Sequence, residues 1–355
     1  MARSGPSAPA SLALLSALLR RDAEAGAGTG SSAASGAARP AISLTNPGDL
    51  DASLADIGGA AALFEAAGVC VFRDVLGRKL VEACREATVP LLARVDAAIA
   101  SRGDVHPDDD FESAEACRRG RRRLDVRGYG MGAPPLDDTR LHGEAVWLPF
   151  VRATLGQSAH ECFRGIVDNR PGSTRQEWHR DGPMPEGERP RCLTIFVPLV
   201  DIDESAGVRA SIMRMSPLHC RPLATGARPL AGPTHFFPGS HAPFRAALYD
   251  DLEADDHAGQ LAHCAPLLER GGFVAFDYRV VHRGSPNTRA TRAEEDAAAI
   301  VGGGDAVCAG NRPPQLPLRN SRPVLYVVFA CEGYADTHNF PADRPLFPQA
   351  RIGEA

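Results

Sequence analysis

Side chains of the kinds that bind metal ions occur at two widely separated places in this sequence. In Trp178-His179-Arg180-Asp181 the histidine and the aspartate stand two residues apart, so in an extended segment both would point to one face. His282 follows the hydrophobic segment Phe276–Val281, at the expected end of a strand. Two imidazoles and a carboxylate suit a first-row divalent metal and leave three octahedral positions open. We therefore predict an open metal site at His179, Asp181 and His282. A surface strand carrying His179 and Asp181, or a hydrogen-bonded histidine at the end of a strand for His282, would have the same sequence.

An arginine is the residue expected to bind a carboxylate in such a site, because its planar guanidinium can donate two parallel hydrogen bonds. Arg322 begins the apolar segment Arg322–Phe329, a predicted strand that we expect to neighbour the one ending at His282. Arg289 and Arg292 are closer to His282 in sequence, but they stand in a charged stretch without a strand pattern. Arg322 is the preferred candidate.

Further arginines precede the histidine motif. Arg123 and Arg127 could reach a pocket and bind an anion, but solvated or ion-paired arginines are the simpler interpretation. The net charge of −5 argues against a nucleic-acid partner, which would need a basic face. The clusters Arg118–Arg119 and Arg121–Arg123 are accordingly predicted to lie in a solvated mixed-charge loop.

The elements that must position these residues are mostly short strands. Alternating apolar residues bounded by turn formers predict strands, whereas helical spacing of apolar residues predicts two helices, the longer of which Pro90 should kink. Residues 101–141 are charged and are predicted to be mostly loop. Short strands without helices between them favour a β-sandwich or jelly roll with the long helix outside one sheet. The predicted helices are Ala60–Ala66 and Lys79–Ile99, and the predicted strands are Val69–Phe72, Arg191–Val200, Gly272–Phe276 and Val324–Ala330.

The domain boundaries follow from composition. We predict one domain over residues 42–345, interrupted by aperiodic insertions at 207–230 and 290–320, and a C-terminal tail at 346–355. Residues 1–41 are rich in Ala, Ser and Gly and have no acidic residue before Asp22, as expected of a disordered tail or an organellar transit peptide. Nine scattered cysteines without a C-x-x-C pair indicate reduced thiols, and no apolar run is long enough to span a membrane. A cytoplasmic or organellar protein is expected.

Several segments, taken in order, resemble the phytanoyl-CoA dioxygenase family of iron(II)/2-oxoglutarate oxygenases. They cover roughly residues 55–345, and the ordered set is far more specific than any one segment. The resembling segments are Gln176–Pro183, Gly232–His241, Val281–Asn287, Arg322–Tyr326 and Asn339–Phe340.

The resemblance implies a mainly β protein with flanking helices, folded as a double-stranded β-helix (jelly roll). It implies that iron(II) is bound by His179, Asp181 and His282, and that Arg322 binds the distal carboxylate of 2-oxoglutarate. Gln176 resembles a residue that lines the active site. The implied reaction with dioxygen is hydroxylation of a small organic or acyl substrate through a ferryl species. The sequence departs from the family between Asn287 and Arg322, where the family has only a few residues.

Two other functions are compatible with the same residues. The chain could be a non-enzymatic binding protein on the same fold, or a cupin-like metalloenzyme that does not use 2-oxoglutarate. Dependence of turnover on iron, oxygen and 2-oxoglutarate separates the three possibilities. Glycine and proline in Gly232–His241 favour a structural bend there, so His235 and His241 are not predicted as metal ligands.

Overall fold

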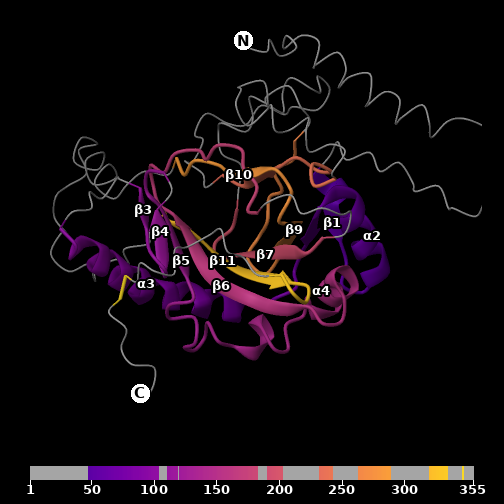
Figure 1. Cartoon of the computed structure of the whole chain (residues 1–355), viewed down its shortest axis with the longest axis horizontal. Coiled ribbons are helices and arrows are strands. Elements are labelled where there is room, and N and C mark those ends of the chain that lie inside the picture. The colour runs from indigo at the N-terminus through magenta and orange to yellow at the C-terminus, as the bar shows by residue number, and fades with distance from the viewer. Residues whose placement is uncertain are drawn as a thin grey trace, which may run out of the picture.

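A nine-stranded sheet forms the centre of the molecule (Figure 1). The computed structural model describes residues 47–103, 110–118, 120–182, 190–202, 232–242, 263–288, 320–334 and 346–347. The strand order is β1-β2-β9-β7-β11-β6-β5-β4-β3, and every pairing is antiparallel except that of β1 with β2. The strands are β1 (Asp51–Ala52), β2 (Val69–Phe72), β3 (Phe111–Glu112), β4 (Ala116–Arg118), β5 (Arg123–Arg127), β6 (His160–Asn169), β7 (Cys192–Pro198), β9 (Phe273–Asp277) and β11 (Arg322–Ala330).

The central strand β11 is buried on both faces. Successive side chains of a strand point to opposite faces, so its nine residues divide into two sets. Leu325, Val327 and Phe329 belong to the main hydrophobic core, together with apolar residues of the helices. Val324 and Tyr326, on the other face, line a cavity. One face of the sheet therefore packs against the hydrophobic core, and the other face borders the cavity.

Among the described residues, three α-helices accompany the sheet: α2 (Ile57–Ala67), α3 (Arg78–Ala100) and α4 (Leu148–Leu155). The long helix α3 lies along one side of the sheet, as expected, and contains Pro90 (Figure 1). The side chain of Asp56 caps α2 by accepting a hydrogen bond from the backbone of Gly59. The short 3-10 helices are η1 (Pro47–Leu50) and η2 (Thr139–Leu141).

A second, two-stranded sheet consists of β8 (Thr234–Phe236) and β10 (His282–Gly284). These strands lie above the large sheet in Figure 1, across the cavity from β11. Distant parts of the chain thus meet in two facing sheets with antiparallel connections. The predicted mainly β jelly roll with flanking helices is confirmed.

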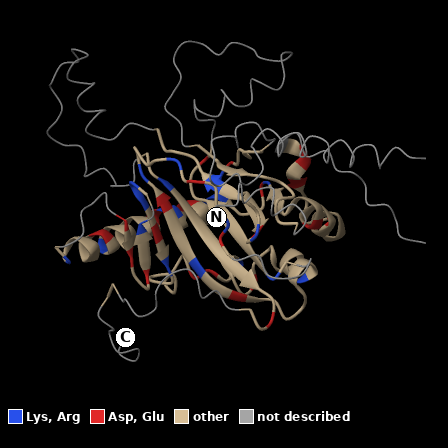
Figure 2. Cartoon of the chain, turned by 45° about the horizontal axis from the view of Figure 1, so that its top comes forward, with Lys and Arg blue, Asp and Glu red and all other residues tan. Residues whose placement is uncertain are grey.

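The described part of residues 101–141 is mostly loop, as predicted, but it also contains three short strands, β3, β4 and β5, that were not predicted. Leu124 and Val126 of β5 pack in a core cluster with residues of α3, whereas Arg123 and Asp125 line the cavity. Charged residues alternate with apolar ones because one face of this strand borders a polar cavity, so the segment resembles a solvated loop in sequence. The predicted mixed-charge loop is also corrected, since Arg118 and Arg123 are buried. Figure 2 shows basic residues near one end of these strands.

The expected neighbour of β11 was also wrong. β11 pairs with β6 and β7, and β7 separates it from β9. The strand thought to end at His282 is divided, because a turn at residues 278–281 stands between β9 and β10. Arg322 and His282 face the same cavity from different sheets.

Some predictions fall outside the described residues. They include the N-terminal segment 1–41, the insertion 207–230, nearly all of 290–320 and most of 346–355. Leu346 and Phe347 are described, and Phe347 stacks on Tyr129 with ring centroids 3.8 Å apart. The seven described cysteines are free thiols, and none of the described helices is both long and apolar enough to cross a membrane.

Candidate metal centre

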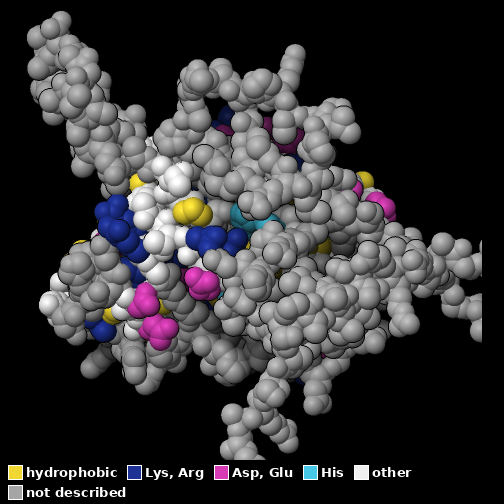
Figure 3. Space-filling view, turned by 90° about the horizontal axis from the view of Figure 1, so that it is seen from above, with side chains coloured by type: hydrophobic (Ala, Val, Ile, Leu, Met, Phe, Trp, Pro, Cys, Tyr) yellow, Lys and Arg dark blue, Asp and Glu magenta, His cyan; other side chains and the backbone are white. Residues whose placement is uncertain are grey.

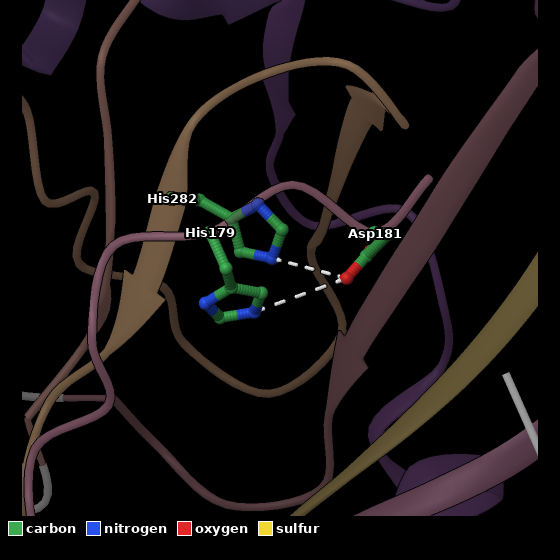
Figure 4. A group of neighbouring side chains, drawn as sticks. All are labelled: His179, Asp181 and His282. Carbon is green, nitrogen blue, oxygen red and sulfur yellow. Dashed lines mark ion pairs between the residues drawn. The ribbon is translucent and has the colours of Figure 1, made fainter. Parts of the chain in front are cut away.

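His179, Asp181 and His282 lie together in the structure, as the sequence predicts (Figure 4). One ligand atom from each lies within 4.8 Å of the other two. The Oδ1 atom of Asp181 is 3.5 Å from Nε2 of His282 and 3.9 Å from Nε2 of His179. They are the only His, Cys, Asp or Glu group of this kind found among the described residues.

Backbone hydrogen bonds hold the two histidines side by side. The N–H of His179 donates to the carbonyl of His282 at 3.0 Å, and that of His282 donates to the carbonyl of His179 at 2.9 Å. The N–H of Asp181 donates to the carbonyl of Tyr278 at 3.2 Å. The His179–Asp181 segment is therefore an extended piece of chain bridged to β10, and not a strand of its own.

Each imidazole is oriented by its second nitrogen. Nδ1 of His179 lies 2.8 Å from the carbonyl oxygen of Glu177, and Nδ1 of His282 lies 3.0 Å from that of Val280. A carbonyl oxygen only accepts, so each Nδ1 carries a proton, and in the neutral imidazole Nε2 then holds the lone pair that can bind a metal. This arrangement is usual for histidines that bind a metal.

Electrostatics also favour a neutral imidazole at His179. Burial, with the neighbouring His282, lowers the pKa of His179 to about 4. A proton on Nε2 would block metal binding, so the low pKa keeps this nitrogen available at neutral pH.

The three side chains open into a cavity of about 580 Å³. From above, histidine side chains are visible beside basic side chains (Figure 3). Strand β11 contributes four alternate residues to the cavity: Arg322, Val324, Tyr326 and Val328. An aromatic wall is formed by Phe163, Phe196, Tyr278 and Tyr326.

Two buried arginines lie at one end of the cavity floor. Arg322 on β11 and Arg123 on β5 both pair with Asn169 of β6, so the three residues form a row across the sheet. Arg322 is 2% exposed and Arg123 is 5% exposed. Burial, with a smaller contribution from Arg322, lowers the pKa of Arg123 to about 9. The expectation that Arg123 is solvated was wrong.

Gln176 helps to join the histidine segment to β10. Its Oε1 accepts a hydrogen bond of 3.0 Å from the backbone of Gly284, and its side chain lines the cavity. A β-carbon on Gly284 would collide with the guanidinium of Arg123 and the amide of Gln176. Glycine at this position lets both side chains pack against β10.

The other candidate residues that the structure describes do not belong to the group of candidate metal ligands. His241 Nε2 contacts the carbonyl of Glu65, and His235 stacks with His263, so neither belongs to the metal group. The guanidinium of Arg127 lies 3.4 Å from the ring centroid of Phe163. Arg289 and Arg292 lie outside the described residues.

Sequence analysis missed Thr194. Its hydroxyl is buried, lines the cavity and has no hydrogen-bond partner among the described residues. The only hint in the sequence was a threonine within a mostly apolar predicted strand. The high β-propensity of threonine explains its presence there equally well.

Comparisons with known proteins give matches only among solved structures. No family model and no curated protein matches the chain. The non-heme alpha ketoglutarate dependent epimerase SnoN from nogalamycin biosynthesis is 14% identical, with a TM-score of 0.43 over 79% of this chain and 84% of that one. AviO1 from Streptomyces viridochromogenes Tue57 is 17% identical, with a TM-score of 0.47 over 82% and 99%.

The non-heme alpha ketoglutarate dependent carbocyclase SnoK from nogalamycin biosynthesis is a third similar structure. It is 15% identical, with a TM-score of 0.45 over 77% of this chain and 83% of that chain. Likeness at this level does not transfer an activity, so the function must be argued from the residues of this chain.

Proposed function

We propose that this protein is an iron(II)- and 2-oxoglutarate-dependent oxygenase that hydroxylates a small organic or acyl substrate. The observation that carries the proposal is the group of two histidines and one aspartate that opens into a cavity with buried arginines. The proposal agrees with the sequence resemblance to phytanoyl-CoA dioxygenases.

The three side chains fit a divalent iron ion. Ligands bound at about 2.0–2.2 Å and at right angles lie roughly 3 Å apart. The observed separations of 3.5 and 3.9 Å from Asp181 Oδ1 need only small side-chain movements to reach that value. Two histidines and one carboxylate with open positions are the donor set of non-haem iron(II) oxygenases.

The buried arginines support a dicarboxylate cosubstrate. A planar guanidinium that lines a cavity can donate two parallel hydrogen bonds to a carboxylate. Arg322 would bind the distal carboxylate of 2-oxoglutarate, and the hydroxyl of Thr194 could donate a further hydrogen bond. Arg123 adds a second positive charge to the same end of the cavity.

When bound, iron and 2-oxoglutarate supply oxidative decarboxylation coupled to oxidation of a substrate C–H bond by dioxygen. His179, His282 and Asp181 would fix the metal on one side of the cavity. The aromatic wall would exclude water and orient the substrate. Hydroxylation of the substrate is the outcome that the resemblance to phytanoyl-CoA dioxygenases implies.

The test is consumption of 2-oxoglutarate by the purified protein with iron(II) and dioxygen. We expect succinate to form slowly even without substrate, and to be absent when iron, oxygen or Asp181 is removed. A protein that binds iron and 2-oxoglutarate but forms no succinate would be a binding protein. Substrate turnover that does not change when 2-oxoglutarate is omitted would indicate a cupin-like enzyme.

A further inference from the structure

The turn at residues 278–281, between β9 and β10, contacts most of the candidate metal centre. Four consecutive backbone carbonyls of this turn accept hydrogen bonds. Tyr278 accepts from the backbone of Asp181 (3.2 Å), Arg279 from Nε of Arg180 (3.1 Å), Val280 from Nδ1 of His282 (3.0 Å) and Val281 from the backbone of Phe237 (2.9 Å). The turn thus determines where Asp181 and His282 lie.

A buried ion pair closes this turn. The backbone N–H and Nε of Arg279 each donate to Oδ1 of Asp277 at 2.9 Å, and Nη2 donates to Oδ2 at 2.7 Å. The two side chains are 2% and 1% exposed. The backbone of Val280 also donates to the carbonyl of Asp277 at 2.9 Å. Three bonds from one arginine to one carboxylate restrict the chain between them to a single conformation.

We propose that Asp277 and Arg279 are positioning residues for the metal centre. Neither side chain lines the cavity, so neither touches metal, cosubstrate or substrate. The pair instead presents the carbonyl of Val280 to the ring of His282 and the carbonyl of Tyr278 to Asp181. Groups that orient metal ligands in this way raise metal affinity. This inference rests on the proposed metal site.

The alternative is that the pair contributes only to folding. Buried ion pairs are often no more stabilising than apolar residues of similar volume, although loss of one partner is strongly destabilising. The double variant Asp277→Leu/Arg279→Met removes both charges together, so it should retain the fold. Arg279→Lys keeps the charge but loses the planar fork.

The experiment is a titration of the wild-type and variant proteins with cobalt(II) alone. Calorimetry measures the affinity, and the visible spectrum of the bound ion reports its coordination. We expect the double variant to bind cobalt about 10- to 100-fold more weakly and to show an altered spectrum. Arg279→Lys should be intermediate. The matched control is Arg270→Gln. Arg270 precedes the N-terminal end of β9 and forms partly exposed ion pairs with Glu82 and Asp201. Its cobalt affinity should be unchanged.

A folded double variant with wild-type cobalt affinity and spectrum would overturn the inference. If the double variant does not fold, wild-type binding by Arg279→Lys would overturn it equally. Wild-type protein that binds no cobalt at all would instead refute the proposed metal site, so the two failures are distinguishable.

Discussion

At the scale of single residues, the proposed function depends on three candidate metal ligands, His179, Asp181 and His282. Each of His179, Asp181 and His282 contributes one atom to a group that is open on its cavity side. Removing any one of them leaves two protein ligands, so the affinity for iron should fall.

Alanine substitution at each ligand tests this arrangement. We expect His179→Ala, Asp181→Ala and His282→Ala to abolish iron-dependent succinate formation while the circular dichroism spectrum stays native. His160→Ala, a substitution of an exposed histidine on β6, serves as the control and should remain active. A ligand variant with near-wild-type turnover would remove that residue from the metal site.

Arg322 is expected to determine cosubstrate affinity. Arg322→Ala would leave the distal carboxylate of 2-oxoglutarate buried without its cation, at a cost of about 3–5 kcal/mol by analogy with broken buried pairs. Iron affinity should change little, and lysine should rescue only in part because it lacks the planar fork. Binding of 2-oxoglutarate to the anaerobic iron-loaded protein measures the effect.

Arg289→Ala and Arg292→Ala are the controls for this prediction. Both should leave the dissociation constant for 2-oxoglutarate unchanged. If either of them weakens binding and Arg322→Ala does not, the cosubstrate arginine has been misassigned.

The sequence predicted the grouping of His179, Asp181 and His282 better than the rest of the cavity. His179 and Asp181 form a short local motif that can be recognised in the sequence. Arg123, by contrast, reaches the cavity only because β5 pairs with β6, which places it near Arg322. Burial of an arginine depends on contacts distant in sequence, and such contacts leave no local pattern. Thr194 was missed for the same reason.

At the scale of elements, the two ends of the predicted insertion between β10 and β11 lie close together. The side-chain amide of Asn287 donates to the backbone carbonyls of Asn169 and Asn320, at 2.8 Å each. The two ends of the insertion therefore meet through one asparagine, although residues 289–319 are not described.

Replacing residues 290–318 with a short Gly-Ser linker should preserve the fold. The hydrogen bonds of Asn287 already hold both ends, so loop closure costs little extra. We expect a change of a few degrees at most in the thermal midpoint, and iron binding should persist. Adding Asn287→Ala to the deletion should lower the midpoint further. Loss of folded protein from the deletion alone would show that the segment contributes to the core.

The regular elements were predictable to the extent that one of their faces meets an apolar core. Alternation in Arg191–Val200 and Val324–Ala330 led to β7 and β11. The strands β3 to β5 were missed because their second face borders a polar cavity. The turn at 278–281 was hidden inside an apolar segment that looked like one continuous strand.

At the scale of the whole molecule, stability should depend on pH through buried histidines. Burial, together with His263 and Arg283, lowers the pKa of His235 to about 3 from an ordinary value of 6.5. Between these two pKa values, His235 is therefore protonated in the unfolded chain but neutral in the folded protein. Stability is fully retained above pH 6.5 and falls as the pH decreases toward 3.

Chemical denaturation of the metal-free protein between pH 7 and 5 tests this linkage. The free energy of unfolding should fall on acidification, by up to about 1.4 kcal/mol per pH unit for each such histidine. His235→Gln should reduce the slope, whereas His160→Gln, at an exposed position, should not. Equal slopes for wild type and His235→Gln would show that His235 is not held neutral.

The central claim is that one ion and one dicarboxylate share this cavity. An anaerobic crystal structure with manganese(II), as a redox-stable substitute for iron, and 2-oxoglutarate tests it most directly. We predict the ion at about 2.0–2.2 Å from Nε2 of His179, Nε2 of His282 and a carboxylate oxygen of Asp181. The distal carboxylate of 2-oxoglutarate should meet the guanidinium of Arg322. An ion bound elsewhere, or a cosubstrate whose distal carboxylate lies away from Arg322, would contradict the account.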